Sequence, residues 1–195
     1  RTLVIWTSDN GAVQRRPAQG SNAPYRGWGY DTSEGAMRVP CVMRWPGVIP
    51  AGRVQDAVCA SLDLLPTLAR IAGAAGPDRP IDGHDIRALI TSAPGATSPW
   101  DEAGFCYYRM GQLQAVRAGP WKLYLGLPAK LINNAGKTAA TALQLFDVRH
   151  DVGEDHEVSP GHPEVVRRLL AMAARARAEL GDGAQAGRGQ RPAGR

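Results

Sequence analysis

The sequence predicts an α/β protein, and three observations support this fold class. An apolar run at residues 2–7 has the character of a buried strand. Apolar residues recur at helical spacing between residues 61 and 73, which indicates an amphipathic helix. Four short apolar segments between residues 104 and 147 are separated by turns, and a second helical pattern follows from Pro163. This last arrangement is typical of a small antiparallel sheet with a terminal helix.

The first half of the chain contains two predicted strands and one predicted helix. The strand at residues 2–7 ends at the polar turn Ser8-Asp9-Asn10-Gly11, and a second strand is predicted at residues 37–45. Ser61 occupies the N-cap position of the predicted helix, and Gly73 supplies its stop.

The second half contains the predicted antiparallel sheet and its helix. The strands are predicted at residues 104–108, 113–117, 121–125 and 143–147. Pro163 suits the first position of the closing helix, whose apolar face comprises Val166, Leu169, Leu170 and Ala173. After Gly181 the composition is dominated by Gly, Ala, Gln and Arg, which predicts a disordered tail.

Length and composition exclude several classes of protein. With 195 residues, of which 44% are hydrophobic, the chain can form a core, and no apolar run reaches the roughly 20 residues that span a bilayer. The net charge is +5, but Lys and Arg are adjacent only at Arg15-Arg16 and Arg167-Arg168, which argues against a nucleic-acid surface. The chain starts at Arg1, directly before the first strand, which predicts that it is cut within a fold.

Asp9 and Asn10 form the sharpest local feature of the sequence. They directly follow a predicted buried strand, where ligands collect in open α/β sheets. A carboxylate beside an amide carbonyl offers two hard oxygens, which suit Ca²⁺ or Mg²⁺. The alternative is a plain turn, because Asp-Asn-Gly is a common turn sequence.

Several segments of the chain carry a family resemblance, in the same order and at the same spacing. They are residues 5–11, 20–27, 34–40, 44–47, 61–68, 81–85, 107–109, 113–123 and 145–147. Together they resemble the sulfatase family, in particular its arylsulfatase A and N-acetylgalactosamine-6-sulfatase branch. The resemblance covers about Thr2 to Leu170.

The resemblance implies a partial alkaline-phosphatase-like (sulfatase) fold. This chain would form the end of the large mixed sheet at 1–100, a small antiparallel subdomain with a terminal helix at 101–180, and the tail at 181–195. It also implies hydrolysis of sulfate esters by a formylglycine residue beside a divalent cation, with Ca²⁺ favoured over Mg²⁺. Asp9 and Asn10 match the family's second pair of metal ligands, which favours the ligand interpretation over the turn.

The family's nucleophile is not found in this sequence. Formylglycine is made from the first residue of a Cys-x-Pro-Ser-Arg or Cys/Ser-x-Ala-x-Arg motif, and Cys41, Cys59 and Cys106 lack this context, as does every serine. We therefore expect the formylglycine only in a missing N-terminal part, and no activity from this chain alone. The three cysteines are predicted to be buried apolar residues.

Three residues are candidates for contacts with the substrate. Arg26 could reach the anion, although it could instead orient its loop through backbone hydrogen bonds. Tyr108 and Arg109 are candidates because the family's C-terminal subdomain borders the substrate pocket, with strand packing as the alternative. The family's sulfate-contacting Lys is replaced by Gly29.

The resemblance also implies the partners of this chain. They are a sulfated small molecule or sulfated glycan and the missing N-terminal half of the same protein, with neither nucleic acid nor a membrane span. Two other functions stay open: a degenerate remnant or binding module without catalysis, which Gly29 favours slightly, and a related phosphonate or phosphate ester hydrolase. The compartment is not set by the sequence, although many members of the family are exported.

Overall fold

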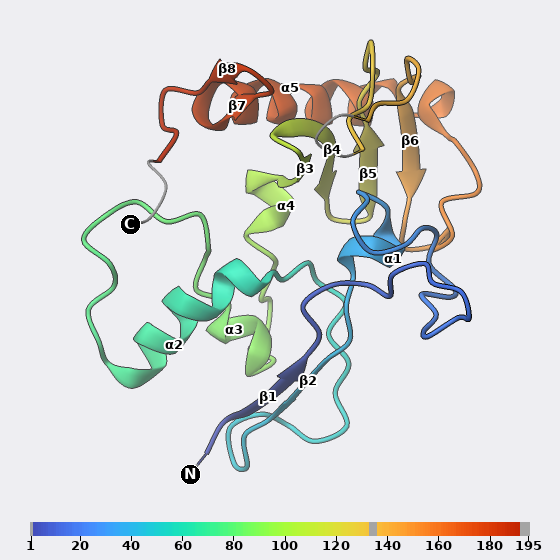
Figure 1. Cartoon of the computed structure of the whole chain (residues 1–195). Coiled ribbons are helices and arrows are strands. Elements are labelled where there is room, and N and C mark those ends of the chain that lie inside the picture. The colour runs from blue at the N-terminus through green and yellow to red at the C-terminus, as the bar shows by residue number, and fades with distance from the viewer. Residues whose placement is uncertain (1, 133–135, 192–195) are drawn as a thin grey trace. The chain divides into compact units, whose positions relative to one another are not determined.

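The computed structural model describes residues 2–132 and 136–191, which form two compact units (Figure 1). The first unit comprises residues 1–7 and 41–103, and the second comprises residues 8–40 and 104–195. The loop of residues 8–40 therefore interrupts the first unit in sequence but belongs to the second.

The first unit contains one strand pair and several short helices. β1 (Val4–Thr7) and β2 (Cys41–Arg44) pair antiparallel, with Trp6 opposite Val42. The helical elements are the 3₁₀ turn η1 (Ser61–Asp63), α2 (Leu64–Ala72), α3 (Arg87–Ile90) and α4 (Trp100–Ala103). The predicted strands and the predicted helix are confirmed, but Ser61 is not the N-cap of the helix, because it lies inside η1 and Asp63 precedes α2. β2 begins later than predicted because Met37 closes a helical turn, α1 (Glu34–Met37).

Asp63 fixes the loops around α2. Its fully buried carboxylate accepts hydrogen bonds from the backbone N–H of Ala60 at 2.7 Å, the backbone N–H of His84 at 2.8 Å and the indole N–H of Trp100 at 2.8 Å. Gly73 ends α2 in the left-handed conformation at φ 67°, as the sequence predicts.

The second unit is a four-stranded antiparallel sheet with one long helix. The strands, in the spatial order β3-β4-β5-β6, are β3 (Phe105–Arg109), β4 (Gln112–Ala118), β5 (Trp121–Tyr124) and β6 (Gln144–Asp147). The short turn η2 (Ser159–Gly161) leads into α5 (Pro163–Leu180), which packs on β4 and β5. This arrangement confirms the predicted sheet and terminal helix. Among the described residues, no helix is both long and apolar enough to cross a bilayer.

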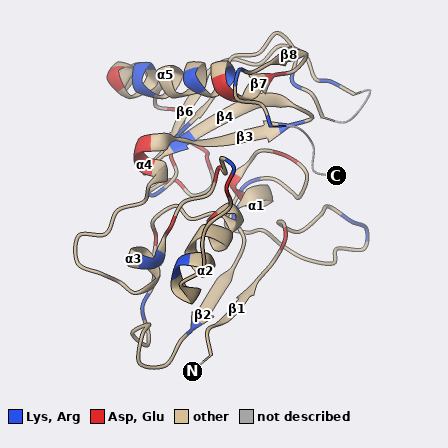
Figure 2. Ribbon diagram, turned by 90° about the vertical axis from the view of Figure 1, so that its left-hand side faces the viewer, with Lys and Arg blue, Asp and Glu red and all other residues tan. Residues whose placement is uncertain are grey.

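The sheet has two faces of different character because side chains alternate along each strand. Leu113, Leu123 and Leu145 face α5 and form a core with Leu169 and Ala173 of the helix, all of them fully buried. Figure 2 shows the Arg and Glu residues of α5 spread along the helix, and all of them except Arg177 are exposed. The opposite face of the sheet carries Tyr107, Arg117, Lys122 and Tyr124, which contact the loop of residues 8–40.

The structure differs from the sequence prediction in the segment after α5. Gly181 to Arg191, predicted to be disordered, form the small hairpin of β7 (Gly181–Asp182) and β8 (Gln185–Ala186) and a following turn. Asp182 explains the order, because its carboxylate accepts from Arg177 at 2.7 Å and from the backbone N–H of Leu113 at 2.9 Å. The amino-acid composition of a segment contains no information about such tertiary contacts. Residues 192–195 lie outside the described residues.

Candidate functional site

Asp9 and Asn10 open the loop of residues 8–40, directly after β1 in the chain. The Asp9 side chain is exposed, and its Oδ1 accepts the backbone N–H of Asn10 at 2.8 Å. The Asn10 amide donates from Nδ2 to the carbonyl of Gly11 at 2.9 Å, which fixes the orientation of the amide. Ser8 Oγ donates to the Asn10 carbonyl at 3.0 Å. Both candidate oxygens are therefore presented from a turn with defined local bonds.

Close backbone contacts fix this turn against α1. The backbone N–H of Gly11 donates to the carbonyl of Ala36 at 2.9 Å. A Cβ at Gly11 would lie 1.8 Å from the carbonyl oxygen of Gly35, so only glycine permits this approach. Asn22 closes the loop from within, because its side chain bonds both the N–H and the carbonyl of Ala12, at 2.6 and 2.9 Å. The position of Asn10 is thus tied to the position of α1.

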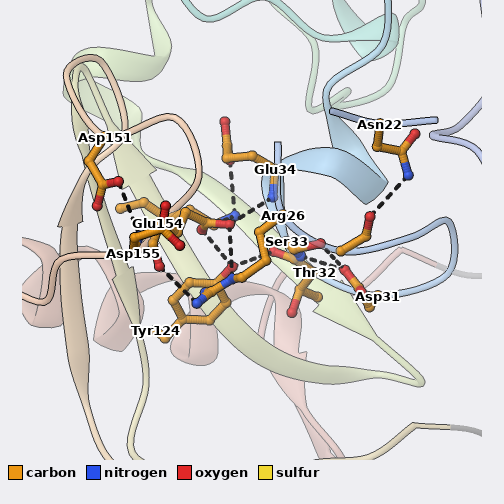
Figure 3. A network of polar contacts seen from close by, with 12 residues as sticks. Asn22, Arg26, Asp31, Thr32, Ser33, Glu34, Tyr124, Asp151, Glu154 and Asp155 are labelled. Carbon is orange, nitrogen blue, oxygen red and sulfur yellow. Dashed lines mark hydrogen bonds and ion pairs between the residues drawn. The ribbon is translucent and has the colours of Figure 1, made fainter. Parts of the chain in front are cut away.

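A buried ionic network fixes α1 on the polar face of the sheet, and Figure 3 shows two of its members, Glu34 and Glu154. Lys122 Nζ lies 2.9 Å from Glu34 Oε1 and 3.1 Å from Glu154 Oε1, and Arg117 Nη1 binds the other oxygen of Glu34. The hydroxyl of Tyr107 donates to Glu34 Oε1 at 2.9 Å. Glu34 and Glu154 are each 1% exposed and Lys122 is fully buried, so water contributes little to their solvation.

The charged groups of the network influence one another's protonation states. Burial opposes ionisation of Glu34, but the attraction of Lys122 and Arg117 is stronger, so the pKa of Glu34 lies below its ordinary value. Burial and the neighbouring Glu34 carboxylate raise the pKa of Tyr107 well above its ordinary value, which keeps the hydroxyl protonated as a donor. A buried network of this kind is destabilised strongly by loss of one member.

The predicted substrate contacts have structural partners in this conformation. Arg26 Nη1 donates to the backbone carbonyl of Glu154 at 2.9 Å, and its Nε lies 3.6 Å from the Glu154 carboxylate (Figure 3). The hydroxyl of Tyr108 donates to the carbonyl of Gly181 at 2.8 Å, and Arg109 Nη2 donates to the carbonyl of Ile132. Arg26 therefore orients its loop, although its side chain keeps 43% exposure. No contact of Tyr108 or Arg109 tests a substrate role.

Gly29 is confined by the backbone around it. Its N–H donates to the carbonyl of Ala12 at 2.8 Å, and a Cβ at this position would lie 2.5 Å from the carbonyl oxygen of Gly11. The loop as it is folded therefore does not accommodate a side chain at this position.

The cysteines differ from the prediction that all three are buried. Cys41 and Cys59 are exposed, and only Cys106 lies partly inside the protein. β2 is short and half of a two-stranded sheet, so Cys41 is not covered within its unit. Burial raises the pKa of the Cys106 thiol to about 11, which leaves it protonated at neutral pH and a poor nucleophile.

Asp9 and Asn10 fit a divalent cation by residue type, but they do not complete its coordination. Ca²⁺ takes six to eight oxygen ligands, and two adjacent side chains supply only part of them. The described ranges contain no group of three or more His, Cys, Asp or Glu residues arranged to hold a metal ion. Asp9 is thus the one carboxylate that this turn offers to a cation.

Two solved structures share the fold of this chain. PsFucS1 sulfatase from Pseudoalteromonas sp. superimposes with a TM-score of 0.71 and 23% identity, over 90% of this chain and 37% of that chain. Ps i-CgsB in complex with k-i-k-neocarrahexaose gives a TM-score of 0.70 and 26% identity, over 89% of this chain and 36% of that chain. The chain therefore has part of the α/β fold of the sulfatases, which confirms the predicted fold class.

Sequence comparison gives the family. Residues 1–74 match the family model described as Sulfatase. The chain is 34% identical to steryl-sulfatase of Mus musculus over 92% of this chain and 33% of the relative. It is 40% identical to N-acetylgalactosamine-6-sulfatase of Canis lupus familiaris over 63% of this chain and 23% of the relative. The chain belongs to the sulfatase family, and it spans about a third of the length of the first curated relatives it matches.

Sequence reasoning missed the residues that fix the candidate site. Glu34 lies in a segment that resembles the family, but no role was predicted for it. Glu154 follows His150 and Asp151 in a polar, Gly-containing segment, yet its carboxylate is buried. Only Lys122 gave a signal of this network in the sequence. It lies in the middle of an apolar strand, and a charge that is buried with its strand needs a buried partner.

Proposed function

We propose that this chain supplies part of the cation site and the supporting subdomain of a hydrolase of sulfuric esters. The observation that carries the proposal is the Asp9-Asn10 pair, presented by a loop that the buried network of Glu34, Lys122 and Glu154 fixes. Membership of the sulfatase family supports the reaction class. The activity belongs to the whole protein, of which this chain would be one part.

Asp9 and Asn10 would each supply one oxygen to the cation, for which Ca²⁺ is the first candidate and Mg²⁺ the second. When bound, the cation would polarise the sulfate group and neutralise its charge. The Gly11 contact with α1 keeps Asn10 in place, and Glu34 keeps α1 in place. The precision of this site would therefore depend on residues that never touch the substrate.

The nucleophile would come from outside these 195 residues. We propose a formylglycine, because the family resemblance implies it and no Cys or Ser here has the motif context. The chain alone is then inactive towards sulfate esters. Translation of the gene upstream of Arg1 tests this directly: a Cys-x-Pro-Ser-Arg or Cys/Ser-x-Ala-x-Arg motif supports the proposal, and an in-frame stop close to Arg1 contradicts it.

The rest of the same protein is the proposed partner of the first unit. Trp6 and Val42 lie opposite each other on β1 and β2, and each is 60% exposed. Apolar strand residues with this exposure are typical of a surface that another segment covers. The proposed partner would pack on these two strands.

The substrate is proposed to be a sulfated sugar. One relative is named N-acetylgalactosamine-6-sulfatase, and one structural neighbour was solved with an oligosaccharide, k-i-k-neocarrahexaose. These names describe the neighbouring proteins, and they support a glycan substrate here without defining which sugar.

The direct test is sulfate release from an aryl sulfate by the natural gene product that contains these residues. We expect Ca²⁺-dependent turnover, and a loss of at least about 100-fold in kcat/KM for Asp9→Asn, which removes a metal ligand. Asp78→Asn is the matched control, because Asp78 is exposed in a loop of the first unit. Absence of turnover, or equal activity of the two variants, contradicts the proposal.

A degenerate binding module without catalysis is the second candidate. Gly29 is the observation that favours it, because the loop excludes the side chain that contacts sulfate in the family. Binding of a sulfated sugar without any turnover by the natural gene product would support this candidate instead.

A further inference from the structure

A small cavity opens in the second unit beside the buried network. It has a volume of about 100 Å³, and Arg26, Tyr124, Leu125, Leu127, Lys130 and Gln144 are among the residues that line it. One buried water needs roughly 10–15 Å³ of such volume, so the cavity has room for a polyatomic group. None of these lining residues belongs to the Asp9-Asn10 turn.

Two cationic side chains gather around one aromatic ring of this cavity. Arg26 Cζ lies 5.6 Å and Lys130 Nζ lies 5.8 Å from the centre of the Tyr124 ring. Lys122 Nζ lies 4.8 Å from the same ring, but it is paired with Glu34 and Glu154, and Arg26 shares the Glu154 carboxylate. Lys130 is therefore the cation of the cavity that has no close carboxylate among the described residues.

Lys130 lacks a close counter-ion. Among the described residues, no carboxylate lies within ion-pair distance of its ammonium group, although Asp31 attracts it from further away. Partial burial and the neighbouring cations Arg109, Lys122 and Arg26 lower the pKa of Lys130, with burial the larger cause. A partly buried cation that has no close counter-ion is typical of a functional site.

We propose that this cavity binds an anionic substituent of a sugar, either a sulfate ester or a uronic carboxylate. Lys130 and the exposed part of Arg26 would pair with the anion, and Gln144 offers an amide at the rim. The half-buried ring of Tyr124 supplies an aromatic wall against which a sugar ring can pack. The inference rests on the proposed function for its substrate class, and it adds a second anionic group, remote from the ester that is hydrolysed.

The test is calorimetric binding of oligosaccharides to the 195-residue chain in EDTA, which keeps the proposed cation site out of the measurement. The probes are a sulfated neutral disaccharide, its desulfated form, an unsulfated uronate disaccharide and inorganic sulfate. We expect an anionic disaccharide to bind more tightly than the desulfated one. Lys130→Gln should weaken this binding about tenfold, as expected for loss of one charge-assisted hydrogen bond.

Lys137→Gln is the matched control, because Lys137 is exposed in the same connecting segment and does not line the cavity. Its affinity should stay within about twofold of the wild type. If Lys130→Gln impairs folding, Gln144→Glu provides the second variant, since an added carboxylate should also weaken binding of an anion. Preference for the sulfated or the uronate probe identifies the source of the anion, and either preference supports the proposal.

Three results would overturn the proposal. These are equal binding of the sulfated, uronate and desulfated probes, equal weakening by Lys130→Gln and Lys137→Gln, and unchanged binding by Gln144→Glu. Failure of the proposed hydrolysis is a separate outcome, because Lys130-dependent binding in EDTA does not require turnover. Conversely, turnover that depends on Asp9, together with binding that does not depend on Lys130, would refute the proposed anion site and leave the proposed function intact.

Discussion

The two units of this chain bury their sheets to very different degrees. In the second unit, Leu113 and Leu123 on one face of the sheet and Lys122 on the other are fully buried. In the first unit, Trp6 and Val42 are 60% exposed, and Leu65 of α2 is also exposed. The second unit therefore has its own core and its own polar network, whereas the strands of the first unit expose most of their residues, with only Ile5 and Met43 partly buried.

This difference separates two physical tasks. The second unit supplies stability, and it also fixes the Asp9-Asn10 turn, because the loop of residues 8–40 belongs to it. The first unit presents apolar strands that would be stabilised by contact with another segment. Changes in the two units should therefore alter different observables: the free energy of unfolding in one case and self-association in the other.

The largest expected effect is that of Glu34→Gln. It leaves Arg117 without its carboxylate and Lys122 with Glu154 alone, and loss of one partner of a buried ion pair costs about 3–5 kcal/mol. The free energy of unfolding in urea measures this loss. Glu164→Gln, at an exposed position of α5, is the control and should stay within about 0.5 kcal/mol of the wild type. Equal stability of the two variants would show that the network does not support the second unit.

A side chain at Gly29 should have the next largest effect. Gly29→Ala places a Cβ against the carbonyl of Gly11, and overpacking of this kind costs about 1–3 kcal/mol. Gly76→Ala is the control, because a Cβ there meets no atom within 4 Å. If thermal unfolding of the two variants is the same, the loop of residues 8–40 is more adaptable than its contacts indicate.

Acid should weaken the second unit through Glu34. The pKa of Glu34 in the folded state lies below its ordinary value of 4.5, so its contribution to stability is full above about pH 4.5. As pH falls from there through the lower pKa of the folded state, the unfolded chain binds the proton first and the contribution is lost. Urea unfolding of the wild type should therefore lose stability below about pH 4.5 more steeply than that of Glu34→Gln. Parallel pH profiles would contradict this assignment.

The smallest effect on stability is expected in the first unit. The double variant Trp6→Thr/Val42→Thr removes the exposed apolar pair of β1 and β2 while keeping β-branched residues in both strands. We expect less self-association in sedimentation velocity, with the free energy of unfolding changed by about 0.5 kcal/mol or less. Val54→Thr, an exposed loop position, is the control. Unchanged self-association of the double variant would indicate that the chain does not self-associate through β1 and β2.

Local patterns in the sequence predicted much of the fold. The spacing of Leu169 and Ala173 predicted α5, and the four apolar segments predicted β3 to β6. Asp9 and Asn10 were found because they follow a strand and resemble a family motif. Such signals lie within a few residues of one another, so they can be read without knowledge of tertiary contacts.

The network that fixes the candidate site could not be predicted in this way. Lys122 and Glu34 are 88 residues apart, and only the packing of the loop on the sheet brings them together. Asp182 was missed for the same reason, since its partner Leu113 is 69 residues away. The exposure of Cys41 depends likewise on what covers β2, which its own sequence does not specify.

The central claim is that buried charges of the second unit fix the turn of Asp9 and Asn10. Amide hydrogen exchange at Gly11 tests it most directly, because this N–H donates to Ala36 of α1 and directly follows Asn10. We predict protection of the Gly11 amide in the wild type, and a loss of protection in Glu34→Gln that exceeds the loss at Leu127, whose N–H bonds Thr141 in the same unit. Equal protection of Gly11 in the two proteins would contradict the claim.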